Sequence, residues 1–291
     1  MGYGSFSTAS YNSMSSSRGY ASKSVDQIFT SRNINDLLNP KKMTNKIRES
    51  RDSEEHPESL PIIIGLDVTG SMGKIPYNLV QGGLPKLMDN IIATAHKDPQ
   101  LMFIGIGDSY FDSAPIQISQ FESSTELIDQ SLTSLFIERG GGGNLEESYS
   151  YAWLIGARHT SADRFEKHNK KGFIFTIGDE RLNNELYEGS LIHHMGYESG
   201  QQSILSKDLY REVSEKYHVF HIHCTDGSYP TNVIEKEWKE ILGENFISCK
   251  SDEIVAIISN KIKQILDLEN NKYIASSDPT KETKSNNPTF L

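Results

Sequence analysis

The residues best suited to chemistry in this chain follow a short apolar segment. Residues 61–66 read Pro-Ile-Ile-Ile-Gly-Leu, and Asp67, Thr69 and Ser71 follow at every second position. An apolar run of strand length that meets small and polar residues indicates a buried strand ending in a tight loop. One carboxylate and two hydroxyls can then turn toward one point, and such oxygen ligands suit a hard divalent cation such as Mg²⁺. We therefore expect a metal site at the carboxyl end of this strand.

The elements that must position this loop alternate between strand and helix patterns from residue 60 onward. This alternation predicts an α/β fold, a doubly wound, mostly parallel six-stranded sheet in the order 3-2-1-4-5-6. The short third strand contains Pro115 and fits a sheet edge. The expected strands are 61–66, 101–106, 115–119, 172–177, 217–223 and 245–249, and the expected helices are 76–96, 124–136, 145–158, 206–216, 231–242 and 252–268.

A second carboxylate, Asp179, follows the fourth expected strand. In the predicted order the first and fourth strands are neighbours, and ligands bind where the carboxyl ends of such strands meet. Asp67 and Asp179 should therefore lie at the same edge of the sheet, for a reason that comes from topology alone.

A glycine-rich segment, Gly140 to Gly143, precedes Asn144 and the helix expected over 145–158. Glycines let the backbone approach an ion closely, so Asn144 is a candidate ligand from this second loop, with Glu146 as the alternative ligand. The alternative makes Asn144 a plain helix N-cap, with Glu146 and Glu147 as favourable charges in the first turn.

The first loop resembles the metal-ion-dependent adhesion site of von Willebrand factor A (vWA) domains, which reads Asp-x-Ser/Thr-x-Ser. The resemblance covers about residues 60–268 and implies a Rossmann-like vWA fold of the intracellular type. It implies that Thr69 and Ser71 bind Mg²⁺ directly, with Mn²⁺ or Ca²⁺ as alternatives, while Asp67 and Asp179 act through water or at longer range. Most vWA domains have a Thr in the second loop, and Asn144 instead resembles the subset with Gly-Gly-Gly-Asp/Asn.

The same resemblance implies a function. It predicts a non-enzymatic protein-protein interaction domain, an adaptor or scaffold, in which an Asp or Glu of a partner completes the coordination of the ion. Among intracellular vWA proteins, recurring roles are adaptors for MoxR-type AAA+ ATPases and scaffolds in stress or ribonucleoprotein complexes. Nothing in this sequence chooses among those partners.

Two other functions stay open. Asp67 to Ser71 also resembles the Asp-Lys-Thr-Gly-Thr motif of haloacid-dehalogenase-like, Mg²⁺-dependent phosphotransferases, in which Asp67 would be the nucleophile. Against this, Val68 replaces the Lys of that motif, and no clear third-motif Lys precedes Asp179. The third hypothesis is a metal-independent scaffold, whose partner binding survives chelation.

Three further groups have simpler interpretations. Asp108 follows the second expected strand and more often serves as a turn residue. His221 and His223 share one face of the fifth strand, but no zinc-binding spacing accompanies them. Asp226 lies in a Thr-Asp-Gly sequence like that of the third metal loop of vWA domains. It follows the fifth strand and not the fourth, so its position in the chain favours Asp179 as the third-loop aspartate.

Composition narrows the class of protein. The chain has 291 residues and a formal net charge of −10, with no basic cluster that would bind nucleic acid. It shows neither a signal sequence nor an apolar run of membrane-spanning length. Cys224 and Cys249 are too few for a disulfide framework, so we expect reduced thiols and a cytoplasmic protein.

The segments that flank the predicted domain differ in character. Residues 1–24 are rich in Ser, Gly and Tyr and are expected to form a disordered tail. Residues 25–59 are expected to be a docking segment and linker, and residues 269–291 a second disordered tail. Residues 183–205 are expected to form an insertion or lid after the fourth strand.

Overall fold

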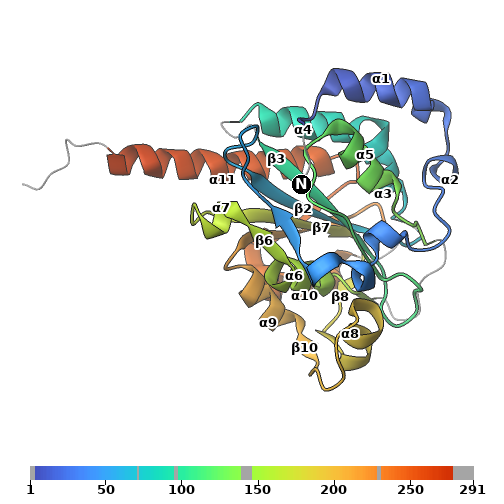
Figure 1. The fold of residues 1–291 in the computed structure, drawn as a ribbon. Coiled ribbons are helices and arrows are strands. Elements are labelled where there is room, and N and C mark those ends of the chain that lie inside the picture. Colours follow the sequence, from blue (N-terminus) through green and yellow to red (C-terminus); the bar gives the residue numbers. More distant parts are fainter. Residues whose placement is uncertain (1–3, 71, 95–97, 139–145, 228–230, 278–291) are drawn as a thin grey trace, which may run out of the picture.

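The computed structural model describes residues 4–70, 72–94, 98–138, 146–227 and 231–277 (Figure 1). At its centre six strands lie side by side in the order β12-β11-β7-β2-β3-β4. Neighbouring strands run parallel, except that β4 is antiparallel to β3. Read from the β4 edge, this is the predicted order 3-2-1-4-5-6, so the predicted fold class is confirmed. The strands are β2 (Leu60–Asp67), β3 (Pro99–Ile106), β4 (Ile116–Ile118), β7 (Gly172–Gly178), β11 (Tyr217–Cys224) and β12 (Phe246–Cys249).

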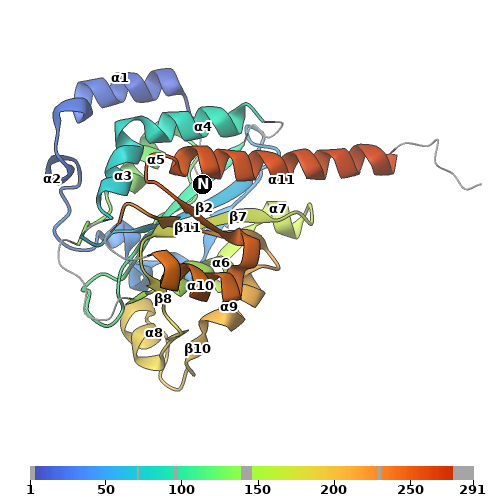
Figure 2. The same ribbon diagram turned by 180° about the vertical axis from the view of Figure 1, so that it is seen from behind.

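Helices cover both faces of the sheet, as Figures 1 and 2 show from opposite sides. One layer contains α1 (Thr8–Arg18), α3 (Lys74–Asn78), α4 (Leu84–Ile92), α5 (Thr125–Thr133) and α11 (Ile254–Ser277). The other contains α6 (Ser150–Arg158), α9 (Ser206–Val213) and α10 (Thr231–Leu242). This three-layer arrangement is the one that alternating strands and helices predict.

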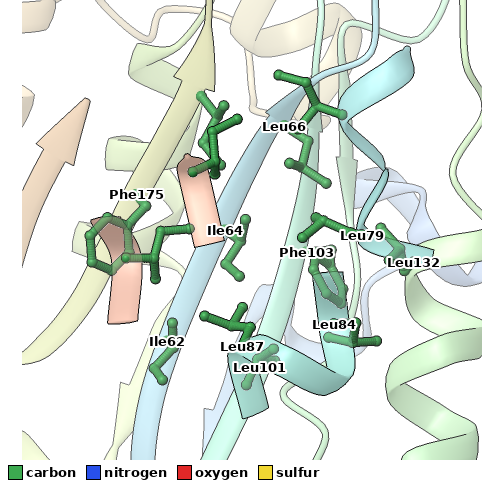
Figure 3. Close-up of a cluster of buried hydrophobic side chains, with 14 of the residues drawn as sticks. Ile62, Ile64, Leu66, Leu79, Leu84, Leu87, Leu101, Phe103, Leu132 and Phe175 are labelled. Carbon is green, nitrogen blue, oxygen red and sulfur yellow. The ribbon is translucent and has the colours of Figure 1, made fainter. Parts of the chain in front are cut away.

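The strand β2 is buried along its whole length because it contributes to both hydrophobic cores. Its side chains alternate, so Ile62, Ile64 and Leu66 join the cluster shown in Figure 3, whereas Ile63 joins the cluster around Trp153. Full burial of one such aliphatic side chain stabilises the fold by about 1.5–3 kcal/mol. A strand buried on both faces is a rigid support for the loop that follows it.

The helix expected over 76–96 is interrupted. Between α3 and α4 the chain makes a π-type turn, η5 (Leu79–Gly83), in which Gly82 has φ +145°. Side chains rarely allow this backbone conformation, so glycine is needed here. The pair Gly82-Gly83 therefore divides one amphipathic stretch into two helices.

The start of the helix expected over 145–158 is wrong. Glu146 and Glu147 form a short strand, β5, that pairs in parallel with β8 (Arg181–Leu182), and α6 begins only at Ser150. The hypothesis that Asn144 caps this helix is therefore wrong as well, because the helix begins six residues later. Pairing with a segment far along the chain overrides the local helical pattern here.

The amino-terminal segment differs from the expected disordered tail. Residues 8–18 form α1, which ends at Gly19 in the left-handed conformation, and η1 (Tyr20–Ser22) follows. The side chains of Phe6, Tyr11 and Tyr20 are buried in the core cluster of α4 and α5. The Tyr11 hydroxyl also donates a hydrogen bond to the carbonyl of Val80, at 2.9 Å. Three aromatic anchors thus order a segment whose composition is otherwise polar.

Residues 25–59 pack against the same domain. They contain the short helices α2 (Val25–Ile28), η2 (Asp36–Leu38), η3 (Pro40–Lys42) and η4 (Thr44–Lys46). The strand β1 (Arg48–Ser50) then pairs in parallel with β6 (Thr160–Ala162), which leads into α7 (Asp163–Glu166). The segment therefore docks on its own chain.

Two features complete the fold. After β8, residues 183–205 contain β9 (Glu185–Leu186), α8 (Glu188–Met195) and β10 (Ile204–Leu205), and Leu186 and Leu191 belong to the core. The short helix η6 (Gly243–Asn245) precedes β12, and α11 continues to Ser277, beyond the expected domain end at residue 268.

Within the described part of the chain, none of the helices has the length and apolarity that a membrane crossing requires.

Candidate metal centre

Asp67 is held in one orientation by its neighbours at the carboxyl end of β2. The side chain is 1% exposed, and its Oδ1 accepts hydrogen bonds from the backbone N–H and the hydroxyl of Thr69, at 2.9 and 2.6 Å. Its Oδ2 accepts a hydrogen bond from the Tyr149 hydroxyl, at 3.1 Å. A buried carboxylate held by three donors is positioned before any ligand arrives.

Tyr149 is not among the site residues expected from the sequence. It is fully buried at the start of α6, where its ring lies 4.9 Å from that of His221. Burial, and then the charges of nearby carboxylates, raise the pKa of its hydroxyl far above the ordinary value, so it stays a donor. A methyl group on Gly178 would lie 1.9 Å from this hydroxyl oxygen, so only glycine fits there. Gly178 therefore leaves the space in which Tyr149 reaches Asp67.

Asp179 follows β7, the strand that pairs with β2. Leu66 and Ile177 are register partners, so both aspartates leave the sheet at the same edge. Asp179 is 1% exposed, and a methyl group on Gly227 would lie 2.2 Å from its Oδ2. The loop after β11 thus packs against this carboxyl group, and the charge of Asp179 acts on Asp67. The structure brings together the two aspartates that topology predicted.

Glu147 is the second residue that sequence reasoning missed as a site residue. It is 1% exposed on β5, and its Oε2 has no hydrogen-bond partner among the described residues. Burial raises the pKa of its carboxyl group, and the charges of Asp67, Glu180 and Asp112 raise it further. The adjacent pair Glu146-Glu147 could have indicated a buried carboxylate. Successive side chains of a strand point to opposite faces, so one of two adjacent glutamates in a strand faces inward.

The electrostatics of the site favour a cation. Burial raises the pKa of Asp67, the Asp179 charge adds to this effect, and the hydrogen bonds from Thr69 and Tyr149 oppose it. Within the described ranges, neither Asp67 nor Glu147 forms an ion pair with a basic side chain. Carboxylates crowded in a buried place repel one another unless protons or a cation neutralise them.

The donor set fits a hard divalent cation. The carboxylate and hydroxyl oxygens of Asp67, Thr69 and Glu147 are of the type that Mg²⁺ prefers, and Glu147 Oε2 is a buried acceptor with no donor. No three His, Cys, Asp or Glu side chains of the described residues are grouped as metal ligands, so hydroxyl oxygens are needed as well. Ser71 and Asn144, both expected to contribute, lie outside the described residues.

The other candidate residues have structural partners. Asp108 Oδ1 accepts from the backbone N–H of Tyr110, at 2.8 Å, as expected of a turn residue. Asp226 accepts from the backbone N–H and the hydroxyl of Ser251, at 3.0 and 2.6 Å, and so ties two loops together. Lys74 also contacts Asp226, at 3.3 Å.

The strand histidines lie in the core. His221 is fully buried, with its Nδ1 2.9 Å from the Thr176 hydroxyl and its ring stacked on Trp238 at 3.7 Å. Burial lowers the pKa of both His221 and His223, which favours neutral rings. In the described part of the chain no zinc-type cluster surrounds them.

No protein-family model matches the chain, and no curated protein matches its sequence. Among solved structures, the pilus adhesin SpaC from Lactobacillus rhamnosus GG in its open conformation has 11% identity and a TM-score of 0.46, covering 75% of this chain and 31% of the adhesin. Proximal thread matrix protein 1 from the mussel byssus has 12% identity and a TM-score of 0.41, with coverages of 72% and 46%. Manganese-loaded Plasmodium vivax TRAP has 11% identity and a TM-score of 0.40, with coverages of 69% and 72%.

The chain spans about a third of the length of the pilus adhesin. The sheet order, the two helical layers and the antiparallel edge strand β4 make the fold Rossmann-like.

Proposed function

We propose that this chain is a non-enzymatic protein-interaction domain whose binding depends on a divalent cation, Mg²⁺ by preference. The observation that carries the proposal is the arrangement of Asp67 at the end of β2. It is buried, held by Thr69 and Tyr149, and adjacent to the strand that delivers Asp179. This arrangement keeps oxygen ligands fixed at the sheet edge where doubly wound folds bind ligands.

Thr69, Ser71, Asp67 and Asp179 would hold the ion, with Asn144 as a further ligand. A bound Mg²⁺ supplies a coordination position for an oxygen of a partner, and an Asp or Glu side chain is the expected donor. The chain's own residues orient the ligands and exclude water around Asp67. Recognition then requires the ion and the partner residue together.

Exposed aromatic side chains near the site support a protein partner. Tyr110 and Phe111 follow Asp108 in the loop after β3 and are 56% and 60% exposed. The Tyr110 ring stacks on that of Tyr187 at 4.7 Å, which holds it at the surface. Aromatic residues are enriched in the contact regions of protein interfaces. The charge of Asp108 acts on Glu147, so this loop borders the carboxylates.

The phosphotransferase alternative requires a lysine beside the nucleophile. Lys74, the nearest lysine in sequence to Asp67, contacts Asp226 on the loop after β11. Val68 stands where the phosphotransferase motif has its lysine, and this favours a binding role for Asp67. A phosphotransferase would release phosphate from p-nitrophenyl phosphate in a Mg²⁺-dependent manner, and Asp67→Asn would abolish that release.

The experiment measures metal binding and partner binding in the same variants. Mn²⁺ is titrated calorimetrically into the wild-type chain, Asp67→Asn and the control Asp226→Asn, which removes an aspartate charge from another loop of the same edge. We expect saturable binding that only Asp67→Asn abolishes. Proteins retained from a native lysate by immobilised chain should be released by chelator and should not bind Asp67→Asn.

Two results would contradict the proposal. If wild-type chain binds no divalent cation, the loop residues only stabilise the turn. If the retained proteins survive chelation and bind Asp67→Asn equally well, the chain is a metal-independent scaffold.

A further inference from the structure

Glu147 lies where two chain segments far apart in sequence fix its backbone. Its carbonyl accepts hydrogen bonds from the backbone N–H groups of Asn183 and Tyr149, at 3.2 and 2.9 Å. The next residue, Ser148, donates its backbone N–H to the carbonyl of Gly107 at the end of β3, at 3.2 Å. The position of Glu147 is thus set by backbone contacts to the loops after β3 and β8, at the edge that carries Asp67.

The two glutamates of β5 face different surroundings. Glu146 pairs in register with Arg181 and is partly exposed, and the positive charge of Arg181 acts on it. Glu147 pairs in register with Leu182 and is 1% exposed. Two adjacent residues of the same type therefore differ in two respects, their access to solvent and their access to a counter-charge.

The burial of Glu147 is costly unless something compensates for it. A buried carboxylate without a hydrogen-bond donor or a counter-ion loses several kcal/mol of solvation. Its Oε2 has no hydrogen-bond partner within the described ranges, and its charged neighbours Asp67, Glu180 and Asp112 are all acidic. A proton would neutralise this carboxyl group and still leave Oε2 without a partner, whereas a cation would both offset the repulsion and bind that oxygen.

We infer that Glu147 is a direct ligand of the divalent cation, an inference that rests on the proposed function. The ligand comes from β5 and not from the helix, and it adds a carboxylate to that of Asp67 and to the hydroxyl of Thr69. Two carboxylates together with a hydroxyl oxygen form a hard-ligand site for Mg²⁺ or Mn²⁺. The pairing of β5 with β8 turns this side chain inward, whereas Glu146 stays partly exposed.

The adjacent glutamate provides a matched control. Mn²⁺ binding is measured by calorimetry and by the loss of the free Mn²⁺ paramagnetic resonance signal in wild type, Glu147→Gln and Glu146→Gln. We expect Glu147→Gln to weaken Mn²⁺ binding by about tenfold or more and Glu146→Gln to change it by less than about twofold.

Thermal unfolding separates a ligand from a purely structural residue. In chelator, Glu147→Gln should melt at or above the wild-type temperature, because the amide removes a buried acidic group. It should also lose most of the rise in melting temperature that Mn²⁺ produces in wild type.

The outcomes separate this inference from the proposed function. If wild type binds Mn²⁺ and Glu147→Gln binds it as tightly as Glu146→Gln, Glu147 is not a ligand and the proposed function survives. If wild type binds no Mn²⁺, both fail.

Discussion

The hydroxyl of Tyr149 donates a hydrogen bond to Oδ2 of Asp67 at 3.1 Å, and this contact joins the first residue before α6 to the last residue of β2. It connects the helical layer to the candidate ligand. The same hydroxyl accepts a long hydrogen bond from the backbone N–H of Glu180, at 3.4 Å. Tyr149 therefore links the loop after β2 to the loop after β7.

Replacing this tyrosine tests that link. Tyr149→Phe keeps the ring and its packing but leaves Asp67 Oδ2 without its donor. Loss of a partner from a buried acceptor costs about 1–3 kcal/mol, so the metal-free variant should unfold at lower urea concentration. Its Mn²⁺ affinity should fall several-fold, because Asp67 is less firmly oriented. Calorimetry and urea titration check both effects, and an unchanged Mn²⁺ affinity would show that Tyr149 does not position the ligand.

The pH dependence of stability should change sign with metal. Burial and Asp179 raise the pKa of Asp67 to about 7, above its ordinary value near 4. Between these two values the native chain retains a proton that the unfolded chain has lost. Without metal, this group's contribution to stability is therefore lost as the pH rises through about 7.

Divalent cations bind the deprotonated carboxylate, so their stabilising effect should grow over the same range. Urea midpoints measured at several pH values in chelator and in Mg²⁺ test this expectation. In Asp67→Asn the metal-free slope should be reduced and the Mg²⁺ effect should vanish. A wild-type chain whose metal-free stability rises toward pH 7 would contradict the assignment.

The loop after β3, which exposes Tyr110 and Phe111, should contribute to partner binding and not to metal binding. Replacing both Tyr110 and Phe111 by Ser should remove most metal-dependent protein capture while leaving Mn²⁺ affinity within about twofold, because neither side chain is a metal ligand. Val233→Ser, which alters an apolar side chain that is 62% exposed on α10, is the control. Equal losses in both variants would mean that the effect is not specific to the loop near the site.

The amino-terminal helix should contribute to stability. Tyr11 is 1% exposed and packs in the core cluster, so Tyr11→Ala should cost about 3–5 kcal/mol, in the range measured for large aromatic truncations. Ser13→Ala, at an exposed position of α1, should be close to neutral. Urea unfolding followed by circular dichroism measures both. An unchanged midpoint in Tyr11→Ala would mean that the segment is not anchored in solution.

Patterns local in sequence were enough to predict the sheet. Each strand is a short apolar run, each helix after it has an apolar face, and this alternation allows few topologies. The predicted strand order by itself places Asp67 and Asp179 at the same edge of the sheet. Asp67 ends β2 and Asp179 directly follows β7, and both strands are buried on two faces, so the strand order fixes where their backbones lie.

The burial of Glu147 and of the amino-terminal aromatic side chains depends on contacts with segments distant in the chain. Glu147 is inward-facing because β5 pairs with β8, more than thirty residues later, and no local periodicity reveals a strand of two residues. Phe6, Tyr11 and Tyr20 are too widely spaced to form an apolar helix face, and only the surface of α4 and α5 makes their burial favourable. The sequence by itself thus determined the sheet and the edge at which a ligand would bind. Tertiary structure decided which buried carboxylate and which hydroxyl surround Asp67, because these contacts gain free energy only when distant segments meet.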